Sequence, residues 1–251
     1  MIYVTGDTHG DWKSRLNEYA FPEQKEMTKD DYVIILGDFG IWDNSDRERR
    51  NLDWLNNRNF TTLFIAGNHS NYDMLNALPV EYWNGGKVNF IRSNVIHLRR
   101  GQVFDIDGIT FFAFGGASSH DISDGILEIG DPRIKTWKKD PDKMFRINHK
   151  SWWKEELPSK EEMQEGVNNL VNHNNEVDFI LTHCASSSTA ALLSAGLYKP
   201  DILTSYFEQI RMLVDYKKWL FGHYHDDKAI NSNEIYFIVM IYKVINAFLH
   251  L

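Results

Sequence analysis

The sequence is poor in cysteine, with Cys184 as the single one among 251 residues. One cysteine excludes a disulfide within the chain and predicts a reducing compartment, the cytoplasm. Proline is also scarce, at 6 residues, which together with only 16 glycines excludes a collagen-like or linker-dominated chain. No apolar stretch reaches the ~20 residues that a membrane-spanning helix needs, and the first residues lack the basic region of a signal peptide. We therefore expect a cytoplasmic protein without membrane contacts.

Basic residues are outnumbered by acidic ones, 27 against 35, for a formal net charge of -8. This balance argues against tight binding of nucleic acid through a basic face. Hydrophobic residues make up 43% of the chain and aromatic residues 14%, which excludes disorder of the whole chain. The composition therefore predicts a folded protein with a substantial core.

Five short apolar runs are each followed by a polar loop that carries Asp, Asn or His. Runs of this length, bounded by turn residues, are typical of buried strands. They cover residues 2–5, 32–36, 61–66, 178–182 and 217–221.

Helices are predicted between these strands. Ser45 with Glu48, and Ser159 with Glu162, form capping-box patterns ahead of apolar residues at helical spacing. Residues 203–214 form a third amphipathic segment.

Residues 102–114 show a different pattern, because two apolar runs flank Asp107-Gly108, which predicts a β-hairpin. Strands that alternate with helices, together with one antiparallel hairpin, predict an α/β fold with mixed sheets.

We expect one domain over residues 1–251, since the polar loops from Asp7 to His225 cannot be divided without splitting a common site. Residues 118–158 are irregular and predict long loops or a lid. The tail, residues 235–251, is apolar: its first residues, 235–239, predict a last strand, and the rest is compatible either with an oligomer contact or with simple packing. The oligomeric state stays open.

The polar loops share one property: each places chemically active side chains just beyond the end of a strand. Because ligands bind outside the carboxyl ends of strands in open α/β sheets, we expect these side chains to converge. The set is Asp7, His9, Asp38, Asn68, His183, His223 and His225. Seven N and O donors exceed what one zinc ion takes and suit two ions that share a carboxylate. Mixed carboxylate, imidazole and amide donors favour Mn, Fe, Zn or Ni.

This set of loops resembles the calcineurin-like metallophosphoesterase superfamily. The resemblance is carried by five motifs in order, over roughly residues 1–230: Gly6-Asp7-Thr8-His9-Gly10, Gly37-Asp38, Gly67-Asn68-His69, Thr182-His183 and Gly222-His223-Tyr224-His225. It implies a four-layer αββα sandwich, in which two mixed sheets are flanked by helices.

The resemblance also implies roles for particular residues. Asp7, His9 and His225 would hold a first metal ion. Asn68, His183 and His223 would hold a second, and Asp38 would bridge the two. His69 would donate a proton to the leaving oxygen or polarise it.

The second motif departs from that of the phosphoprotein phosphatases. The Asp that would orient the proton-donating histidine falls at Ile41, and the phosphate-gripping Arg falls at Trp42. We therefore expect a smaller phosphoester rather than a phosphoprotein as the substrate. Asp73, four residues beyond His69, is a candidate to orient it, as are Asp11 and Asp43.

Three further residues are candidates for substrate contacts: Trp42, His120 and Arg47. Trp42 could stack on an aromatic leaving group or pack into the core. His120 follows a strand and either lines the pocket or lies in a solvated loop. Arg47, like Arg49 and Arg50, either reaches a phosphate or belongs to a solvated helix face. Cys184 is expected to be a small filler rather than a nucleophile.

The predicted function is a metal-dependent phosphoesterase that hydrolyses a phosphomonoester or phosphodiester by in-line attack of a hydroxide bridging two divalent metals, with Mn²⁺ preferred. The absence of an arginine at Trp42 favours diesters or nucleotide-like substrates, because a dianionic monoester gains from such a residue. Two alternatives are a non-catalytic interaction scaffold on the same fold, and a nuclease.

Overall fold

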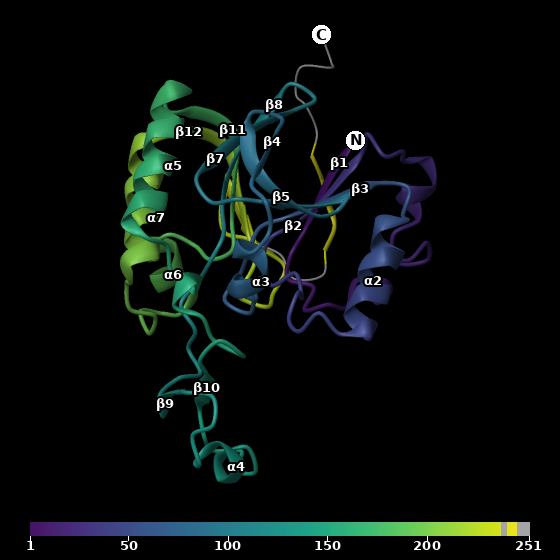
Figure 1. Ribbon diagram of the computed structural model, residues 1–251. Coiled ribbons are helices and arrows are strands. Elements are labelled where there is room, and N and C mark those ends of the chain that lie inside the picture. Colours follow the sequence, from purple (N-terminus) through teal and green to yellow (C-terminus); the bar gives the residue numbers. More distant parts are fainter. Residues whose placement is uncertain (237–239, 245–251) are drawn as a thin grey trace.

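The computed structural model describes residues 1–236 and 240–244, which build two mixed sheets packed face to face (Figure 1). The first sheet has the strand order β15-β1-β2-β3-β6-β5-β4. Its strands are β1 (Ile2–Thr5), β2 (Tyr32–Ile35), β3 (Thr61–Phe64), β4 (Glu81–Trp83), β5 (Gly86–Arg92), β6 (Val95–Leu98) and β15 (Tyr242–Val244). Strands β1, β2, β3 and β6 run parallel, and the outer strands are antiparallel to their neighbours.

The second sheet has the order β13-β14-β12-β11-β8-β7. Its strands are β7 (Gln102–Ile106), β8 (Ile109–Phe114), β11 (Glu176–Thr182), β12 (Asp215–Phe221), β13 (Lys228–Ala229) and β14 (Glu234–Tyr236). Strands β8, β11, β12 and β14 run parallel, and β7 forms with β8 the hairpin predicted around Asp107-Gly108.

Alternation of side chains along the strands gives each sheet two apolar faces. In β2, Ile34 faces the partner sheet, where it joins a core with Phe111 and Leu181, whereas Val33 and Ile35 face outward. Parallel strands buried on both faces explain why their sequences are continuous apolar runs.

Helices cover both outer faces, as Figure 1 shows. Helix α2 (Asp46–Asn56) packs Leu52 and Leu55 on the first sheet. Helices α5 (Lys160–Asn172) and α7 (Ile202–Leu213) cover the second sheet, with Leu170 and Phe207 in the contact. The predicted four-layer arrangement is therefore confirmed.

The predicted helix starts are observed, with one difference. Ser159 and Glu162 form a complete capping box on α5. Ser45 accepts from the Glu48 amide, but the Glu48 carboxylate turns to the amides of residues 42–44 instead of completing the box. Glu48 thereby fixes the loop that contains Trp42.

Short elements lie in the connections. They are α1 (Trp12–Arg15), α3 (Tyr72–Asn76), α4 (Ile134–Trp137), α6 (Ser187–Leu193) and the 3₁₀ turns Pro22–Glu26 and Lys154–Glu156. None of the helices in the described part of the chain combines the length and apolar character needed to cross a bilayer.

Residues 118–158, predicted as loops or a lid, contain a small arm that extends away from the sandwich (Figure 1). Strands β9 (Gly125–Leu127) and β10 (Phe145–Ile147) pair in parallel within it, and α4 lies between them in sequence. Trp153 joins the core on the outer face of the first sheet and donates to Asp73 of α3, so the base of the arm is packed on that sheet.

The apolar tail divides between the two sheets. Glu234–Tyr236 pairs with β12, in agreement with a strand beginning near 235, and Tyr242–Val244 pairs with β1 at the edge of the first sheet. Residues 237–239 and 245–251 of the predicted tail lie outside the described residues.

Candidate metal centre

The seven predicted metal-binding residues lie in loops that follow five parallel strands. Asp7 and His9 follow β1, Asp38 follows β2, Asn68 follows β3, His183 follows β11, and His223 and His225 follow β12. The structure brings these side chains from both sheets to one edge of the sandwich, as their positions after the strands predicted.

Asp38 is at the centre of the group and is only 2% exposed. Its Oδ2 lies 3.4 Å from Nε2 of His183, 3.9 Å from Nε2 of His9 and 4.0 Å from Nε2 of His69. Its Oδ1 accepts the backbone N–H of His69 at 2.8 Å, which fixes the carboxylate.

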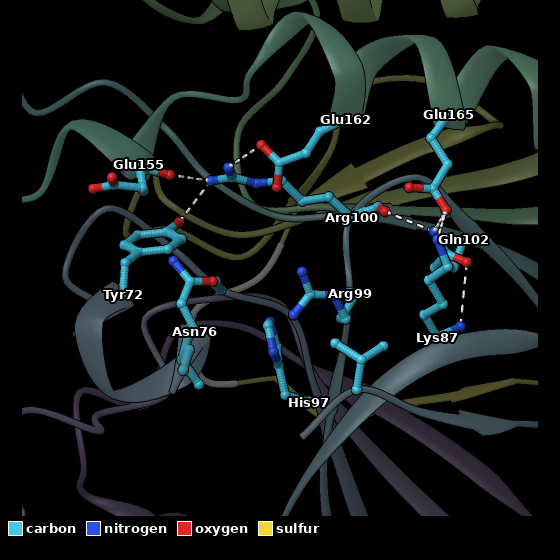
Figure 2. A pocket seen from close by; sticks show the side chains of 13 residues that line it. Tyr72, Asn76, Lys87, His97, Arg99, Arg100, Gln102, Glu155, Glu162 and Glu165 are labelled. Atoms are coloured by element: carbon cyan, nitrogen blue, oxygen red, sulfur yellow. Dashed lines mark hydrogen bonds and ion pairs between the residues drawn. The ribbon is translucent and has the colours of Figure 1, made fainter. Parts of the chain in front are cut away.

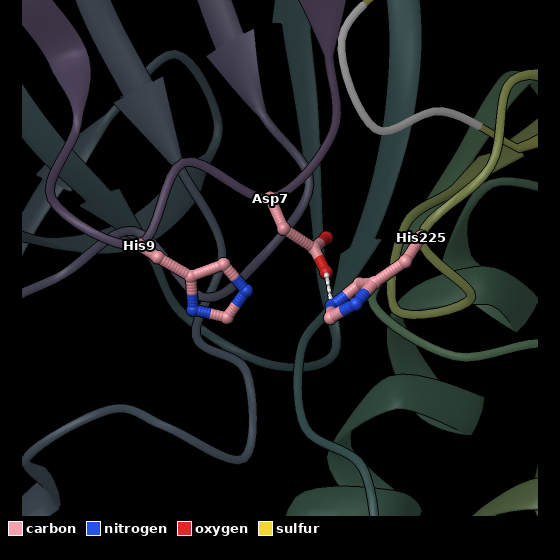
Figure 3. A group of neighbouring side chains, drawn as sticks. All are labelled: Asp7, His9 and His225. Carbon is pink, nitrogen blue, oxygen red and sulfur yellow. Dashed lines mark ion pairs between the residues drawn. The ribbon is translucent and has the colours of Figure 1, made fainter.

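Asp7 organises a second part of the group (Figure 3). His9 and His225 flank its carboxylate, and the three side chains offer donor atoms within 4.8 Å of one another. Nε2 of His225 lies 3.5 Å from Asp7 Oδ2, while the backbone N–H of His223 donates to Asp7 Oδ1 at 3.0 Å. Asp7 therefore ties the loop after β12 to the loop after β1.

Asn68 and His183 face each other, with Oδ1 of Asn68 3.2 Å from Nε2 of His183. His183 Nδ1 donates to the Leu36 carbonyl at 2.8 Å, which directs Nε2 toward the oxygens of Asn68 and Asp38. Asn68 Nδ2 contacts Ser119 Oγ at 3.5 Å, and that hydroxyl donates to Glu156 at 2.6 Å. Ser119 and Glu156 therefore support the amide orientation that points Oδ1 into the site.

His120, a predicted substrate contact, lies beside this centre. Its Nε2 is 3.2 Å from Nε2 of His223, and its ring stacks on Tyr198 with centroids 5.1 Å apart. His120 is therefore exposed to solvent and lies beside His223, and Tyr198 extends the aromatic surface outward.

The buried charges shift the pKa values of the group. Burial lowers the pKa of His183, but the carboxylates of Asp38 and Asp7 outweigh it and raise that pKa to about 9. Burial raises the pKa of Asp38, but His183, His69 and His9 together hold it below its usual range. A hydrogen bond with Asp7 raises the pKa of His225.

The donor set fits divalent cations. Nε2 of His9 is buried and has no hydrogen-bond partner among residues 1–236 and 240–244. Asp38 Oδ2, Asn68 Oδ1 and His183 Nε2 all present lone pairs to the same space when the imidazole is neutral. Such a set of acceptors is satisfied by cations that prefer N and O ligands.

The backbone at the site is unusual. His9, Asp38, His223 and His225 have φ values of 46°, 42°, 71° and 53°, in the left-handed region that non-glycine residues rarely adopt. A Cβ on Gly67 would collide with Asp38, and one on Gly222 would collide with Asp7. The glycines in these motifs therefore give the carboxylates room.

A family model for calcineurin-like phosphoesterases matches residues 1–227, which include all seven of these residues. The chain belongs to this family. No curated protein matches the sequence.

Among solved structures, this phosphoesterase is similar to the crystal structure of a phosphopantetheinyl hydrolase from Mycobacterium tuberculosis. The two share 15% sequence identity, with a TM-score of 0.42, over 94% of this chain and 86% of that one.

Among residues 1–236 and 240–244, Asp38 is the one carboxylate within 4.0 Å of the His69 ring nitrogens. The position expected to supply a second, Ile41, is buried among apolar side chains. Asp73 is not a substitute, because His149 and Trp153 contact its carboxylate at 2.9 and 2.7 Å. Burial lowers the pKa of His69, Asp38 opposes this, and the charge of Arg146 adds to the lowering.

The Trp42 side chain lines a pocket of about 540 Å³, and His9 lines the same pocket. It is 43% exposed, so the expectation of core packing is wrong for this residue. Its Nε1–H donates to the His69 carbonyl at 3.0 Å, and a Cβ on Gly10 would lie 3.3 Å from its ring. The indole is thus held at the rim of the site with a face available to the pocket.

Arg47 lines the same pocket as Trp42, whereas Arg49 is paired with Asp46 on the helix surface. Cys184 is buried, and burial raises the pKa of its thiol well above the ordinary value, which agrees with a filler rather than a nucleophile.

Three contributors were not found from the sequence, namely Glu156, Tyr198 and Arg146, and Ser119 was not singled out. Ser119 precedes the predicted His120, which was the available signal for it. Arg146, on the arm, pairs with Asp121, with its Nε 2.9 Å from Asp121 Oδ1. No local sequence pattern identifies Arg146, because the arm that carries it is distant in sequence from the metal-binding loops.

Proposed function

We propose that this protein is a phosphoesterase that uses two divalent cations, Mn²⁺ by preference, to hydrolyse a small phosphodiester or nucleotide-like substrate. The observation that supports this most directly is the position of Asp38, whose single oxygen Oδ2 lies within 4.0 Å of three imidazole nitrogens. A carboxylate in that position suits a bridge between two cations.

In this proposal Asp7, His9 and His225 hold one cation, and Asn68, His183 and His223 hold the other. When bound, the two cations would neutralise the phosphoryl oxygens and lower the pKa of a water molecule. The chain positions the donors through hydrogen bonds: Leu36 orients His183, and Ser119 orients Asn68.

His69 is the proposed catalytic group at the leaving oxygen. Its backbone N–H is bonded to Asp38 and its carbonyl to Trp42, so the ring is held between the metal ligands and the pocket. Its N–H would donate to the oxygen that leaves the phosphorus atom, a contribution typically worth about 10²- to 10⁴-fold.

The pocket lined by Trp42 supports a substrate with a planar leaving group. An exposed indole held at one edge offers a face for stacking, with Arg47 on the same wall. The chain has Trp42 where the phosphoprotein phosphatases place an arginine, which favours the single negative charge of a diester.

The test is a paired rate assay on metal-free protein reconstituted with Mn²⁺. It compares a nitrophenyl phosphomonoester with the bis-nitrophenyl diester, and uses Asp38→Asn as the blank. We expect diester turnover well above monoester turnover. The reverse order would contradict the diester preference and direct attention to Arg47 and Arg146. If the protein retains no metal after reconstitution and its turnover is no greater than that of the blank, the proposed enzymatic function is contradicted. That result would favour a non-catalytic scaffold.

A further inference from the structure

A second pocket, of about 190 Å³, lies between α3, α5 and the strands β5, β6 and β7 (Figure 2). None of the seven proposed metal ligands lines it. Its wall nevertheless reaches the metal-binding loop, because Tyr72 donates its hydroxyl to the Gly67 carbonyl, next to Asn68, at 3.0 Å.

Two of the three cations in this pocket are neutralised. Lys87 Nζ lies 2.5 Å from Glu165, and Arg100 Nη1 lies 3.2 Å from Glu162. Arg100 is further held by the Gly115 carbonyl and the Tyr72 hydroxyl, at 2.8 and 2.7 Å. These contacts use the nitrogens of Arg100, while Glu165 balances the charge of Lys87.

Arg99 is the exception. Its side chain lies in the middle of the pocket, between His97 and Arg100 in Figure 2. Nη1 donates to Asn89 Oδ1 at 3.2 Å, and within residues 1–236 and 240–244 the guanidinium forms no ion pair with a carboxylate. A half-buried guanidinium with most of its N–H groups unused is a donor for an anion.

His97 adds an acceptor. The amide of Asn89 donates to the carbonyls of Leu78 and Pro79, so its Oδ1 must accept from His97 Nδ1, at 3.1 Å. This fixes the tautomer of a neutral imidazole and leaves Nε2 with a lone pair. Burial, together with Arg99 and Arg100, lowers the pKa of His97 to about 3, so the ring stays neutral.

We propose that this pocket binds a small oxyanion that carries its own hydrogen-bond donor, such as protonated phosphate or a hydroxy acid. The Arg99 guanidinium would bind two oxygens of the anion, and His97 Nε2 would accept its O–H. The site is separate from the metal centre, and the proposal does not depend on the esterase activity.

The test measures anion binding to the metal-free protein by titration calorimetry at pH 7, with inorganic phosphate and sulfate as probes. The two anions have the same shape, but only phosphate carries a proton at this pH. We expect phosphate to bind at least 10-fold more tightly than sulfate, and Arg99→Gln to weaken phosphate binding at least 10-fold. Arg92→Gln is the matched control, since Arg92 is on the same sheet but is paired with Asp53 at 2.7 Å.

Three outcomes would overturn the proposal: no phosphate binding at millimolar concentration, equal binding by Arg99→Gln and the wild type, or equal affinity for sulfate and phosphate. Equal binding by Arg99→Gln would assign the anion to another place, such as the metal-free histidines.

Discussion

Two buried imidazoles show how neighbours decide the charge of the same group. His183 is fully buried between Asp38 and Asp7, and its pKa is raised to about 9. His97 is 7% exposed and lies beside Arg99 and Arg100, and its pKa is lowered to about 3. Burial acts in the same direction on both, so the sign of the charge beside each ring makes the difference. In the two proposals above, the carboxylates beside His183 would attract cations, and Arg99 beside His97 would attract a small anion although Glu155, Glu162 and Glu165 also line that pocket.

The strongest test of this comparison removes the carboxylate beside His183. In metal-free Asp38→Asn, the pKa of His183 should fall, because its largest favourable charge is lost, and NMR titration of the imidazole would measure this. The same variant should bind metal at least about 100-fold more weakly. Asp53→Asn, on the surface, is the control. An unchanged His183 pKa would show that Asp38 is not the cause of the shift.

A second test examines His69, an imidazole near the same carboxylate, where burial outweighs the raising effect of Asp38 on the pKa. The pKa of His69 is lowered although its Nε2 is 4.0 Å from Asp38. His69→Ala should reduce turnover of the preferred ester by about 10²- to 10⁴-fold. Metal content, measured by elemental analysis, should stay at the wild-type value. Loss of metal together with activity would instead make His69 a structural part of the centre.

A third, smaller effect concerns His97 and the pH dependence of folding. Because its pKa in the folded state lies below the ordinary 6.5, the unfolded chain binds more protons between pH 6.5 and about 3. The free energy of unfolding should therefore fall as the pH falls through this window, by about 1.4 kcal/mol per pH unit from this group. Denaturant titrations of metal-free protein should show a shallower slope for His97→Gln and an unchanged slope for His173→Gln, an exposed control.

The sequence predicted the main strands and the convergence of their loops, because short apolar runs end at polar residues at one edge. It also predicted the hairpin and the α5 capping box from local patterns. It did not predict the partners of Asp73, since His149 and Trp153 are more than 70 residues away along the chain. Helical spacing from His69 was too local a guide.

The second pocket could not be predicted from the sequence either, because its residues are also far apart along the chain. Its walls come from α3, α5 and three strands, and what distinguishes Arg99 from Arg100 is the three-dimensional position of Glu162. Core packing, one of the two alternatives for Trp42, was based on the usual burial of large aromatic residues, whereas this side chain is 43% exposed and donates its Nε1–H to the His69 carbonyl.

The left-handed backbone at His9, Asp38, His223 and His225 has a consequence for how this protein can change over time. Each such residue costs about 1 to 2 kcal/mol relative to a relaxed conformation, a cost that glycine at the same position would avoid. Selection for thermal stability alone would therefore favour the replacement of these four residues by glycine. Variants selected in this way would tend to lose the proposed metal centre. Selection for the function of these side chains is needed to retain them. Their retention among descendants of this protein would therefore indicate that the function is under selection.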